Sequence, residues 1–339
     1  MGHTQDYLED RLRRTEQSVG RFCSKLESYA SLSIGEDIDQ ETLRKGVYEL
    51  IKEAVDRGKR VRPLLVHLSH DIVGGSFGQI DDLALLPELA SKGTIIIDDI
   101  QDSAQTRDQK LPLYKSRGVA LAINAGNFLY FIPGLMLAQM KMDEHAKYGI
   151  LKSYMEIGVA GHIGQGADLY WGETGLRFTE SGYLQMNALK ASAFWFAADV
   201  GAIAGGANET QRRKLREVVQ VMGIAYQLRD DLLSLDPTAH DYGDDISEGK
   251  RSLMVLKTLE IGGTPSQRLQ GILSLKTREP ALIEEAVQIM RESGSVGYVE
   301  QKARNFVERA SNILVQSFPD SEYRGVFLEV IHQSVSRNK

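Results

Sequence analysis

The sequence contains one cysteine, Cys23, in 339 residues. A single cysteine excludes an intramolecular disulfide framework and a zinc site built from several cysteines. It fits a reducing compartment, so we expect a cytoplasmic protein. Residues 1–20 also lack an apolar segment and are rich in charged side chains, so we expect no signal peptide.

The sequence has no excess of positive charge. It carries 40 Lys and Arg against 46 Asp and Glu, a formal net charge of −6. A nucleic-acid-binding protein that relies on phosphate contacts needs a basic face, so we expect no nucleic-acid partner. Hydrophobic residues make up 42% and charged residues 25% of the chain, which indicates a folded globular protein rather than a disordered or fibrous one.

Proline is scarce, and so are segments in which polar and apolar residues alternate. The eight prolines leave long stretches where apolar residues recur every three or four positions. This spacing predicts helices in nearly the whole chain. The sequence has no linker long enough to separate domains and no internal repeat. We therefore expect a single all-α domain over residues 1–339.

One segment lacks charge altogether. Residues 118–140 contain no Asp, Glu, Lys or Arg and are long enough to span a bilayer. However, the segment contains the polar residues Asn124 and Gln139 and a central Pro133, and no second stretch of this kind occurs. We expect a buried helix of a bundle, kinked or broken at Pro133, and no transmembrane segment.

Against this background, an aspartate cluster interrupts an apolar stretch at residues 93–102. Asp98 and Asp102 are four residues apart, and Asp99 follows Asp98. On a helix this spacing places Asp98 and Asp102 on one face, one turn apart. The three carboxylates are therefore expected to converge.

A second aspartate pair, Asp230 and Asp231, ends another apolar helix. An apolar stripe leads to it through Leu215, Val219, Met222 and Tyr226. Continuing the stripe by four residues reaches Asp230, so we expect this carboxylate in a core-facing position.

Carboxylates that face a protein interior imply cations, partners or a water-filled cavity, because burying them unpaired is very unfavourable. Sites made only of oxygen ligands suit Mg²⁺ better than zinc. Either cluster alone could equally be a solvated helix face, but two clusters on apolar helices favour a metal site. With basic residues elsewhere, the clusters predict an anionic substrate bridged by metal ions, and a diphosphate fits this description.

Basic residues could bind such a substrate. Lys59 and Arg62 lie at a turn before a predicted helix, where free backbone N–H groups favour anions, although a solvated surface is the alternative. Lys190 interrupts an otherwise apolar helix, and here the alternative is a structural lysine that extends to solvent. Arg107 and Lys250 each follow an acidic segment and could be surface ion pairs or phosphate contacts.

The order of these elements resembles the trans-prenyl diphosphate synthase family. Seven elements of the family have counterparts here. They are the Gly-Lys-x-x-Arg-Pro stretch, the first aspartate-rich motif, the arginine that follows it, the Gly-Gln-x-x-Asp element, a mid-chain lysine, the second aspartate-rich motif and a late lysine. In chain order these are residues 58–63, residues 98–102, Arg107, residues 164–168, Lys190, residues 226–231 and Lys250. Several elements in the right order are far more specific than any one of them.

The resemblance implies an all-α helical bundle of the isoprenoid synthase type around a central cavity. It implies three Mg²⁺ ions that hold an allylic diphosphate, whose C–O bond ionises, and attack on the cation by the double bond of isopentenyl diphosphate. The implied metal ligands are Asp98, Asp99, Asp102, Asp230 and Asp231; the implied contacts to the allylic diphosphate are Arg107, Lys190 and Lys250, and those to isopentenyl diphosphate are Lys59 and Arg62. The candidate catalytic residues are Asp98, Asp99, Asp102, Lys190 and Gln227, the last of which is expected near the cation.

Several positions depart from the family's pattern. Asp108 stands where a second arginine is usual and Ser91 where a histidine is usual, and both usual residues hold isopentenyl diphosphate. These departures motivate an alternative, a terpene synthase that ionises an allylic diphosphate and cyclises or quenches it. Ser234 replaces the third acid of the second motif, and Asp241 replaces a lysine of the next loop. The departures at Ser234 and Asp241 motivate another alternative, a non-catalytic subunit of a heteromeric synthase.

Product length and oligomeric state are also expectations from the resemblance. Bulky residues four and five positions before the first motif stop chain growth in this family, whereas this sequence has Thr94 and Gly93 there. We expect an open cavity, a product of C20 or longer, and a shorter product from Gly93→Phe. The uncharged segment 118–140 is the expected interface of a homodimer.

Overall fold

A computed structural model describes residues 2–30, 38–174, 178–239 and 242–336 of the chain. Helices dominate these residues, and no β-strand occurs among them; one isolated bridge pairs Arg107 with Lys110. The prediction of an all-α fold is therefore confirmed.

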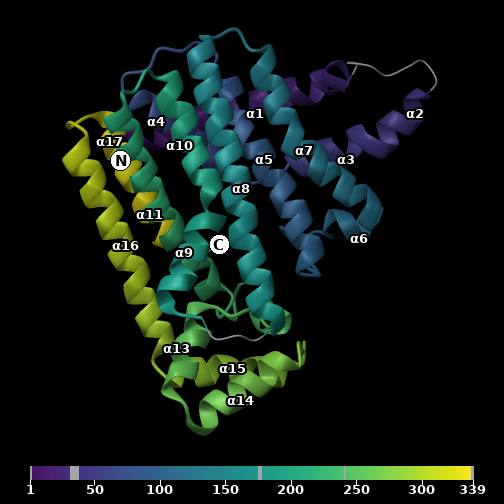
Figure 1. Ribbon diagram of the computed structural model, residues 1–339, viewed down its shortest axis with the longest axis vertical. Helices are drawn as coiled ribbons and strands as arrows, with labels where there is room; N and C mark the ends of the chain where they lie inside the picture. The colour runs from purple at the N-terminus through teal and green to yellow at the C-terminus, as the bar shows by residue number, and fades with distance from the viewer. Residues whose placement is uncertain (1, 31–37, 175–177, 240–241, 337–339) are drawn as a thin grey trace. The chain divides into compact units, whose positions relative to one another are not determined.

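The helices follow one another with short connections (Figure 1). The first part of the chain forms α1 (Gly2–Ala30), α2 (Gln40–Leu43), the π-helical turn η1 (Arg44–Tyr48), α3 (Glu49–Val55), α4 (Val61–Asp71), α5 (Ile80–Gln101), α6 (Leu113–Arg117) and α7 (Val119–Gln139). The middle forms α8 (Glu144–Thr174), α9 (Glu180–Lys190), α10 (Ser192–Ala204), α11 (Glu209–Leu233) and α12 (Asp244–Glu248). The last part forms α13 (Leu253–Ile261), α14 (Gly263–Ser274), α15 (Pro280–Glu292), α16 (Ser295–Ser317) and α17 (Glu322–Ser336).

The chain divides into two compact units, each built from separate stretches of sequence. Unit 1 comprises Met1–Glu156, Ala193–Leu215 and Asp320–Val326, and unit 2 comprises Ile157–Ser192, Arg216–Pro319 and Phe327–Lys339. The expectation of one domain over residues 1–339 stays a prediction.

In unit 1, α5 packs against α1, α3, α4, α6 and α7, and Figure 1 shows α5 beside α7. The backbones of α5 and α7 approach closely because glycines face each other: a β-carbon on Gly93 would lie 2.7 Å from the carbonyl oxygen of Gly126. The expectation that Gly93 borders open space is therefore wrong. Its neighbour Thr94 is exposed and donates a hydrogen bond to the Ala90 carbonyl at 3.3 Å.

The uncharged segment forms α7, which runs without a break through Pro133. Its buried side includes Leu129, which is fully buried, whereas Phe131 is 78% exposed. Among the described residues, α7 is the helix with the length and composition to cross a membrane, a property that it shares with core helices of soluble proteins. Length and composition alone therefore do not decide between these two environments.

A buried ion pair and a capping box fix α10 and α11 at their junction in unit 1. Asp199 on α10 is fully buried and accepts hydrogen bonds from Ser153 at 2.6 Å and from Arg212 Nε at 2.9 Å. The capping box starts α11: Gln211 N donates to Asn208 Oδ1 at 2.9 Å, and Asn208 N donates to Gln211 Oε1 at 3.0 Å.

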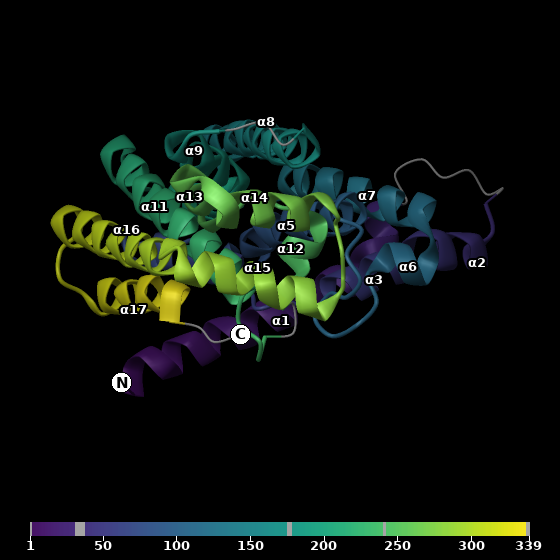
Figure 2. The same ribbon diagram turned by 90° about the horizontal axis from the view of Figure 1, so that it is seen from below.

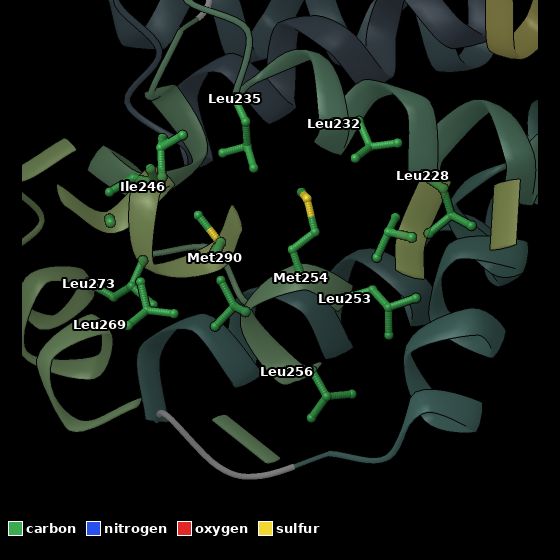
Figure 3. Packing of buried hydrophobic residues seen from close by; sticks show 14 of the residues in the cluster. Leu228, Leu232, Leu235, Ile246, Leu253, Met254, Leu256, Leu269, Leu273 and Met290 are labelled. Atoms are coloured by element: carbon green, nitrogen blue, oxygen red, sulfur yellow. The ribbon is translucent and has the colours of Figure 1, made fainter. Parts of the chain in front are cut away.

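Unit 2 has its own apolar core, to which α9 and α16 contribute as well as α11 to α15; Figure 3 shows part of it. In that view aliphatic and methionine side chains of α11, α12, α13, α14 and α15, and Leu235 just after α11, lie close together; the labelled residues are Leu228, Leu232, Leu235, Ile246, Leu253, Met254, Leu256, Leu269, Leu273 and Met290. Helix α13 packs against α9, α14, α15 and α16, and Figure 2 shows α14 beside α15. Burial of apolar side chains on one stripe of each helix explains why these short helices are stable together.

Acidic residues that follow α11 form a short helix in unit 2. This helix, α12, starts after Gly243, which has a left-handed conformation with φ of 78°. Only glycine adopts this conformation without strain, so the turn before α12 depends on it.

Candidate active site

The first aspartate cluster, Asp98, Asp99 and Asp102, lies at the carboxyl end of α5 in unit 1. Asp102 is the residue that caps the helix, and its N–H donates to the carbonyl of Asp98 at 2.8 Å. Asp98 and Asp102 are therefore one helical turn apart, as the spacing predicted. Both are half-buried, whereas Asp99 is only 3% exposed.

Arg107 holds the buried carboxylate of this cluster. Its Nε donates to Asp99 Oδ1 at 2.8 Å, and its terminal nitrogen lies 2.5 Å from the same oxygen. The turn that carries Arg107 is closed by two hydrogen bonds with Lys110, at 2.8 and 3.0 Å. Burial raises the pKa of Asp99, and the charge of Arg107 partly offsets this effect. The predicted phosphate-binding arginine is thus paired with a metal-ligand candidate.

The basic turn before α4 also belongs to unit 1, and its side chains have different environments. Lys59 is exposed, and Arg62 is half-buried with its guanidinium 5.3 Å from the centre of the Phe194 ring. Arg60, for which no role is predicted above, is buried and donates to Glu88 at 2.9 Å and to Glu16 at 2.8 Å. Glu88 interrupts the otherwise apolar run 83–90 of α5, and this was the sequence signal for the buried pair.

The second aspartate cluster, Asp230 and Asp231, lies near the end of α11 in unit 2. The structure buries Asp231, which is 8% exposed, and leaves Asp230 half-buried. Asp230, expected in a core-facing position, is therefore only partly buried, and its neighbour Asp231 is the more buried of the two carboxylates. Ser234, directly after the end of α11, stabilises the last turn of the helix, because its Oγ donates to the carbonyl of Asp231 at 2.7 Å. The hydroxyl that replaces the family's third acid thus bonds to the backbone.

Two side chains orient the Asp231 carboxylate. Tyr183 on α9 donates its hydroxyl hydrogen to one oxygen, and Gln227 Nε2 donates to the other at 3.1 Å. Burial, reinforced by the charge of Asp245, raises the pKa of Asp231 to about 7, while the hydrogen bonds from Tyr183 and Gln227 oppose the shift. Gln227, expected beside the substrate cation, is therefore a neighbour of the carboxylate.

Lys190 meets Asp168 of the Gly-Gln-x-x-Asp element. The two side chains form an ion pair between α9 and α8. The glycine of the element explains how the helices come so close: a β-carbon on Gly164 would lie 2.9 Å from Leu189 Cβ and from the backbone nitrogen of Lys190. The element therefore combines a packing glycine with a carboxylate that positions Lys190.

Lys250 pairs with the acidic helix that the sequence interpretation missed. Its ammonium lies 2.8 Å from Glu248 and 3.3 Å from Asp245, both on α12. The charge of Asp245 also acts on Asp231, so α12 adds negative charge beside the second cluster. Asp241, the substituted loop lysine, lies outside the described residues.

Carboxylate oxygens in both clusters provide hard ligands, which Mg²⁺ prefers. In the described part of the chain, no three His, Cys, Asp or Glu side chains are grouped closely enough to hold a metal ion without rearrangement. Asp99 and Asp231 are each engaged by neighbouring donors, and Asp98 and Asp102 are close to one another through one helical turn. The donor chemistry of the residues fits a divalent metal, with carboxylates already oriented by Arg107 and Tyr183.

Comparisons with known proteins identify the family of the chain. The family model of polyprenyl synthetase matches residues 44–290. A short chain isoprenyl diphosphate synthase from Methanothermobacter thermautotrophicus is 31% identical, over 82% of this chain and 85% of its own length. A geranylfarnesyl diphosphate synthase from Aeropyrum pernix is 32% identical, over 76% of this chain and 83% of its own.

Solved structures share the fold. A geranylgeranyl pyrophosphate synthase from Corynebacterium glutamicum superimposes with a TM-score of 0.84 at 21% identity, covering 98% of both chains. A polyprenyl synthase from Caulobacter crescentus gives a TM-score of 0.83 at 21% identity and covers 100% of this chain and 98% of its own. At this identity the structures show the isoprenoid synthase fold, and the family model together with the relatives above shows that the chain belongs to the polyprenyl synthetase family.

Proposed function

We propose that this protein is a magnesium-dependent prenyl diphosphate synthase, which condenses an allylic diphosphate with isopentenyl diphosphate to a trans-prenyl diphosphate of C20 or longer. The observation that carries the proposal is the carboxyl end of α5, where Asp98 and Asp102 lie one turn apart and Arg107 is held against Asp99. The names of relatives support the length: besides the geranylfarnesyl diphosphate synthase, a geranylgeranyl diphosphate synthase from Methanosarcina mazei is 29% identical over 86% of this chain.

Each aspartate cluster would hold Mg²⁺ through its carboxylates, three ions in all with the substrate. Asp98, Asp99 and Asp102 are the ligands in unit 1, and Asp230 and Asp231 those in unit 2. Bound Mg²⁺ would draw negative charge from the departing diphosphate and so favour ionisation of the allylic C–O bond. Tyr183 and Gln227 fix the orientation of the Asp231 carboxylate for this role.

Arg107, Lys190 and Lys250 would bind the allylic diphosphate. Each is already paired with a carboxylate, Arg107 with Asp99 and Lys190 with Asp168, so each cation is held in a defined position before substrate arrives. A phosphate group can replace a carboxylate as the partner of such a cation, and the planar guanidinium of Arg107 suits two phosphate oxygens at once. The cations then stabilise the charge that develops on the leaving group.

The test is an elongation assay with purified protein, Mg²⁺, isopentenyl diphosphate and allylic primers of several lengths. We expect longer diphosphates, and loss of at least about 100-fold of the activity in Asp98→Ala. Asp6→Ala, which removes an exposed carboxylate on α1, is the matched control and should keep full activity. Absence of any longer diphosphate from the unaltered protein would contradict the proposal.

The relatives, which are named as prenyl diphosphate synthases, do not favour the terpene synthase alternative. That alternative is motivated by Ser91 and Asp108, and it predicts a hydrocarbon or alcohol from an allylic diphosphate supplied alone. A non-catalytic subunit predicts no activity from the homogeneous chain. The elongation assay, repeated without isopentenyl diphosphate and with analysis of hydrocarbons and alcohols, separates all three functions.

We also propose that the protein forms a homodimer. We propose a cytoplasmic location, because a chain with a single cysteine is compatible with a reducing compartment. Unit 1 exposes large apolar side chains on two helices joined by a hydrogen bond from Tyr154 to the Tyr130 carbonyl. They are Val119, Leu121, Ile123 and Phe131 on α7 and Tyr148, Leu151 and Met155 on α8. Apolar patches of this kind are typical of interfaces between subunits. Because α7 already packs on α5, we favour a second copy over lipid as the partner of its exposed side.

A further inference from the structure

Lys92 is a buried lysine on α5, in unit 1, that none of the roles above uses. Its side chain is about nine-tenths buried, with 8% of the residue exposed. Within the described part of the chain its ammonium forms no hydrogen bond, and the nearest carboxylate oxygen, on Glu88, is 3.9 Å away. A buried ammonium without a close partner costs free energy unless a ligand supplies one.

The neighbouring charges do not neutralise Lys92. Glu88 is engaged by Arg60, whose guanidinium also donates to the carbonyl of Val55 at 2.8 Å. Burial lowers the pKa of Lys92, the charges of Arg60 and Arg62 lower it further, and Glu88 and the exposed Asp108 oppose them. Arg60 is thus paired with Glu88 and with Glu16, whereas Lys92 and Arg62 form no hydrogen bond with Glu88 among the described residues.

The turn before α4 completes a set of anion-binding groups around this ammonium. A β-carbon on Gly58 would lie 2.6 Å from Lys92 Nζ, so the glycine leaves the space that the ammonium occupies. The Nε of Arg62 is buried and has no hydrogen-bond partner among the described residues. Arg60, at the N-cap of α4, provides no side-chain cap, so the first N–H groups of this 11-residue helix point to the same turn without a side-chain acceptor.

We propose that Lys92 binds the diphosphate of the second substrate, isopentenyl diphosphate, together with Arg62 and the start of α4. The inference rests on the proposed function for the identity of the ligand. The group consists of cations and N–H donors, and its buried carboxylate, Glu88, is hydrogen-bonded to Arg60, so we expect it to hold a diphosphate without a metal ion. A site without metal suits isopentenyl diphosphate, because its C–O bond stays intact in the reaction. The aspartate clusters with their Mg²⁺ ions suit the allylic substrate, because its diphosphate is the leaving group.

The position of Lys92 also explains how the chain tolerates two unusual residues. Ser91 and Asp108 stand where the family has cationic or hydrogen-bonding side chains for isopentenyl diphosphate. Lys92 follows Ser91 directly and lies within electrostatic reach of Asp108. A cation lost from one side of the site is therefore replaced by one from α5.

The test is isothermal titration calorimetry with isopentenyl diphosphate in the presence of EDTA, which removes metal ions. The full chain should bind, and Lys92→Met should raise the Kd by at least about tenfold, because a charge-assisted hydrogen bond is lost. Lys92→Gln, which keeps a polar side chain without the charge, should weaken binding in the same direction. Lys52→Met, at an exposed lysine on α3, is the control and should leave the Kd unchanged.

Steady-state kinetics and thermal denaturation separate binding from a structural role. Lys92→Met should raise the KM for isopentenyl diphosphate, leave that for the allylic substrate within about twofold, and keep or raise the melting temperature, since a buried unpaired charge is removed. A lower melting temperature with unchanged Kd, or no metal-free binding by the unaltered chain, overturns the inference. Lys92-dependent binding without elongation would refute the proposed function alone.

Discussion

Thr94 and Gly93 are adjacent on α5, yet a new side chain would meet different surroundings at each position. Thr94 is exposed and one turn before Asp98, whereas Gly93 lies against the backbone of α7. We predict that Thr94→Phe shortens the product by one or more five-carbon units, because the added ring blocks the path of the growing chain. Chromatography of the dephosphorylated products measures this shift. Unchanged product length would contradict a role of Thr94 in limiting the cavity.

Gly93→Phe serves as the comparison for that prediction. Its β-carbon would lie 2.7 Å from the Gly126 carbonyl oxygen and 3.2 Å from Leu129 Cβ, contacts that only movement of a helix can relieve. We expect a lower melting temperature, with a loss of stability of at least about 1–3 kcal/mol. A shorter product from this variant would therefore not by itself report on the cavity.

At the residue scale, sequence spacing predicted which carboxylates share a helix turn but not which of them is buried. Asp98 and Asp102 follow from the four-residue period of a helix. The burial of Asp99 and Asp231 depends on Arg107 and Tyr183, which come from other segments of the chain. The environment of Lys92 could not be predicted for the same reason, because its neighbours Gly58 and Arg62 come from the turn before α4.

At the scale of elements, one carboxylate joins three helices of unit 2. Glu180, at the start of α9, pairs with Lys257 on α13 at 2.7 Å and with Lys302 on α16, and it accepts a hydrogen bond from Tyr298 on α16 at 2.8 Å. Burial alone would raise its pKa, but these partners together lower the pKa of Glu180 to about 2. The carboxylate is thus more stable in its charged form when the protein is folded.

We predict that Glu180 stabilises the protein above its ordinary pKa of about 4.5 and that this contribution disappears as the pH falls toward 2. The folded protein binds the proton less readily than the unfolded chain, so acid favours unfolding. Urea denaturation of the unaltered protein and of Glu180→Gln should differ by up to about 3 kcal/mol at pH 7 and progressively less from pH 4.5 to pH 3. A difference independent of pH would show that the carboxylate charge is not responsible.

Helix periodicity predicted the long elements better than the short ones. The apolar spacing identified α5, α7 and α11, which are long enough for the pattern to repeat several times. It missed α12, whose five residues are too few for the apolar pattern to repeat. Proline did not break α7, because the rest of the helix is held by packing against α5.

At the scale of the whole molecule, the order of motifs predicted the family and the all-α class. It did not predict that stretches as distant as residues 1–156 and 320–326 gather in one compact unit. Such long-range grouping follows from which apolar faces fit together, and composition and local spacing do not carry that information.

The homodimer is the property of the whole molecule that is most directly open to a test. We predict sedimentation at about twice the chain mass of 37.7 kDa at micromolar concentration, and at the monomer mass for Phe131→Glu. Phe131 is 78% exposed on α7, so a charge there leaves the fold intact but costs free energy when a second copy covers it. Leu275→Glu, at a residue 61% exposed after α14, should remain dimeric. Monomeric unaltered protein would refute the interface, and a shift to detergent or lipid would indicate a membrane as the partner of α7.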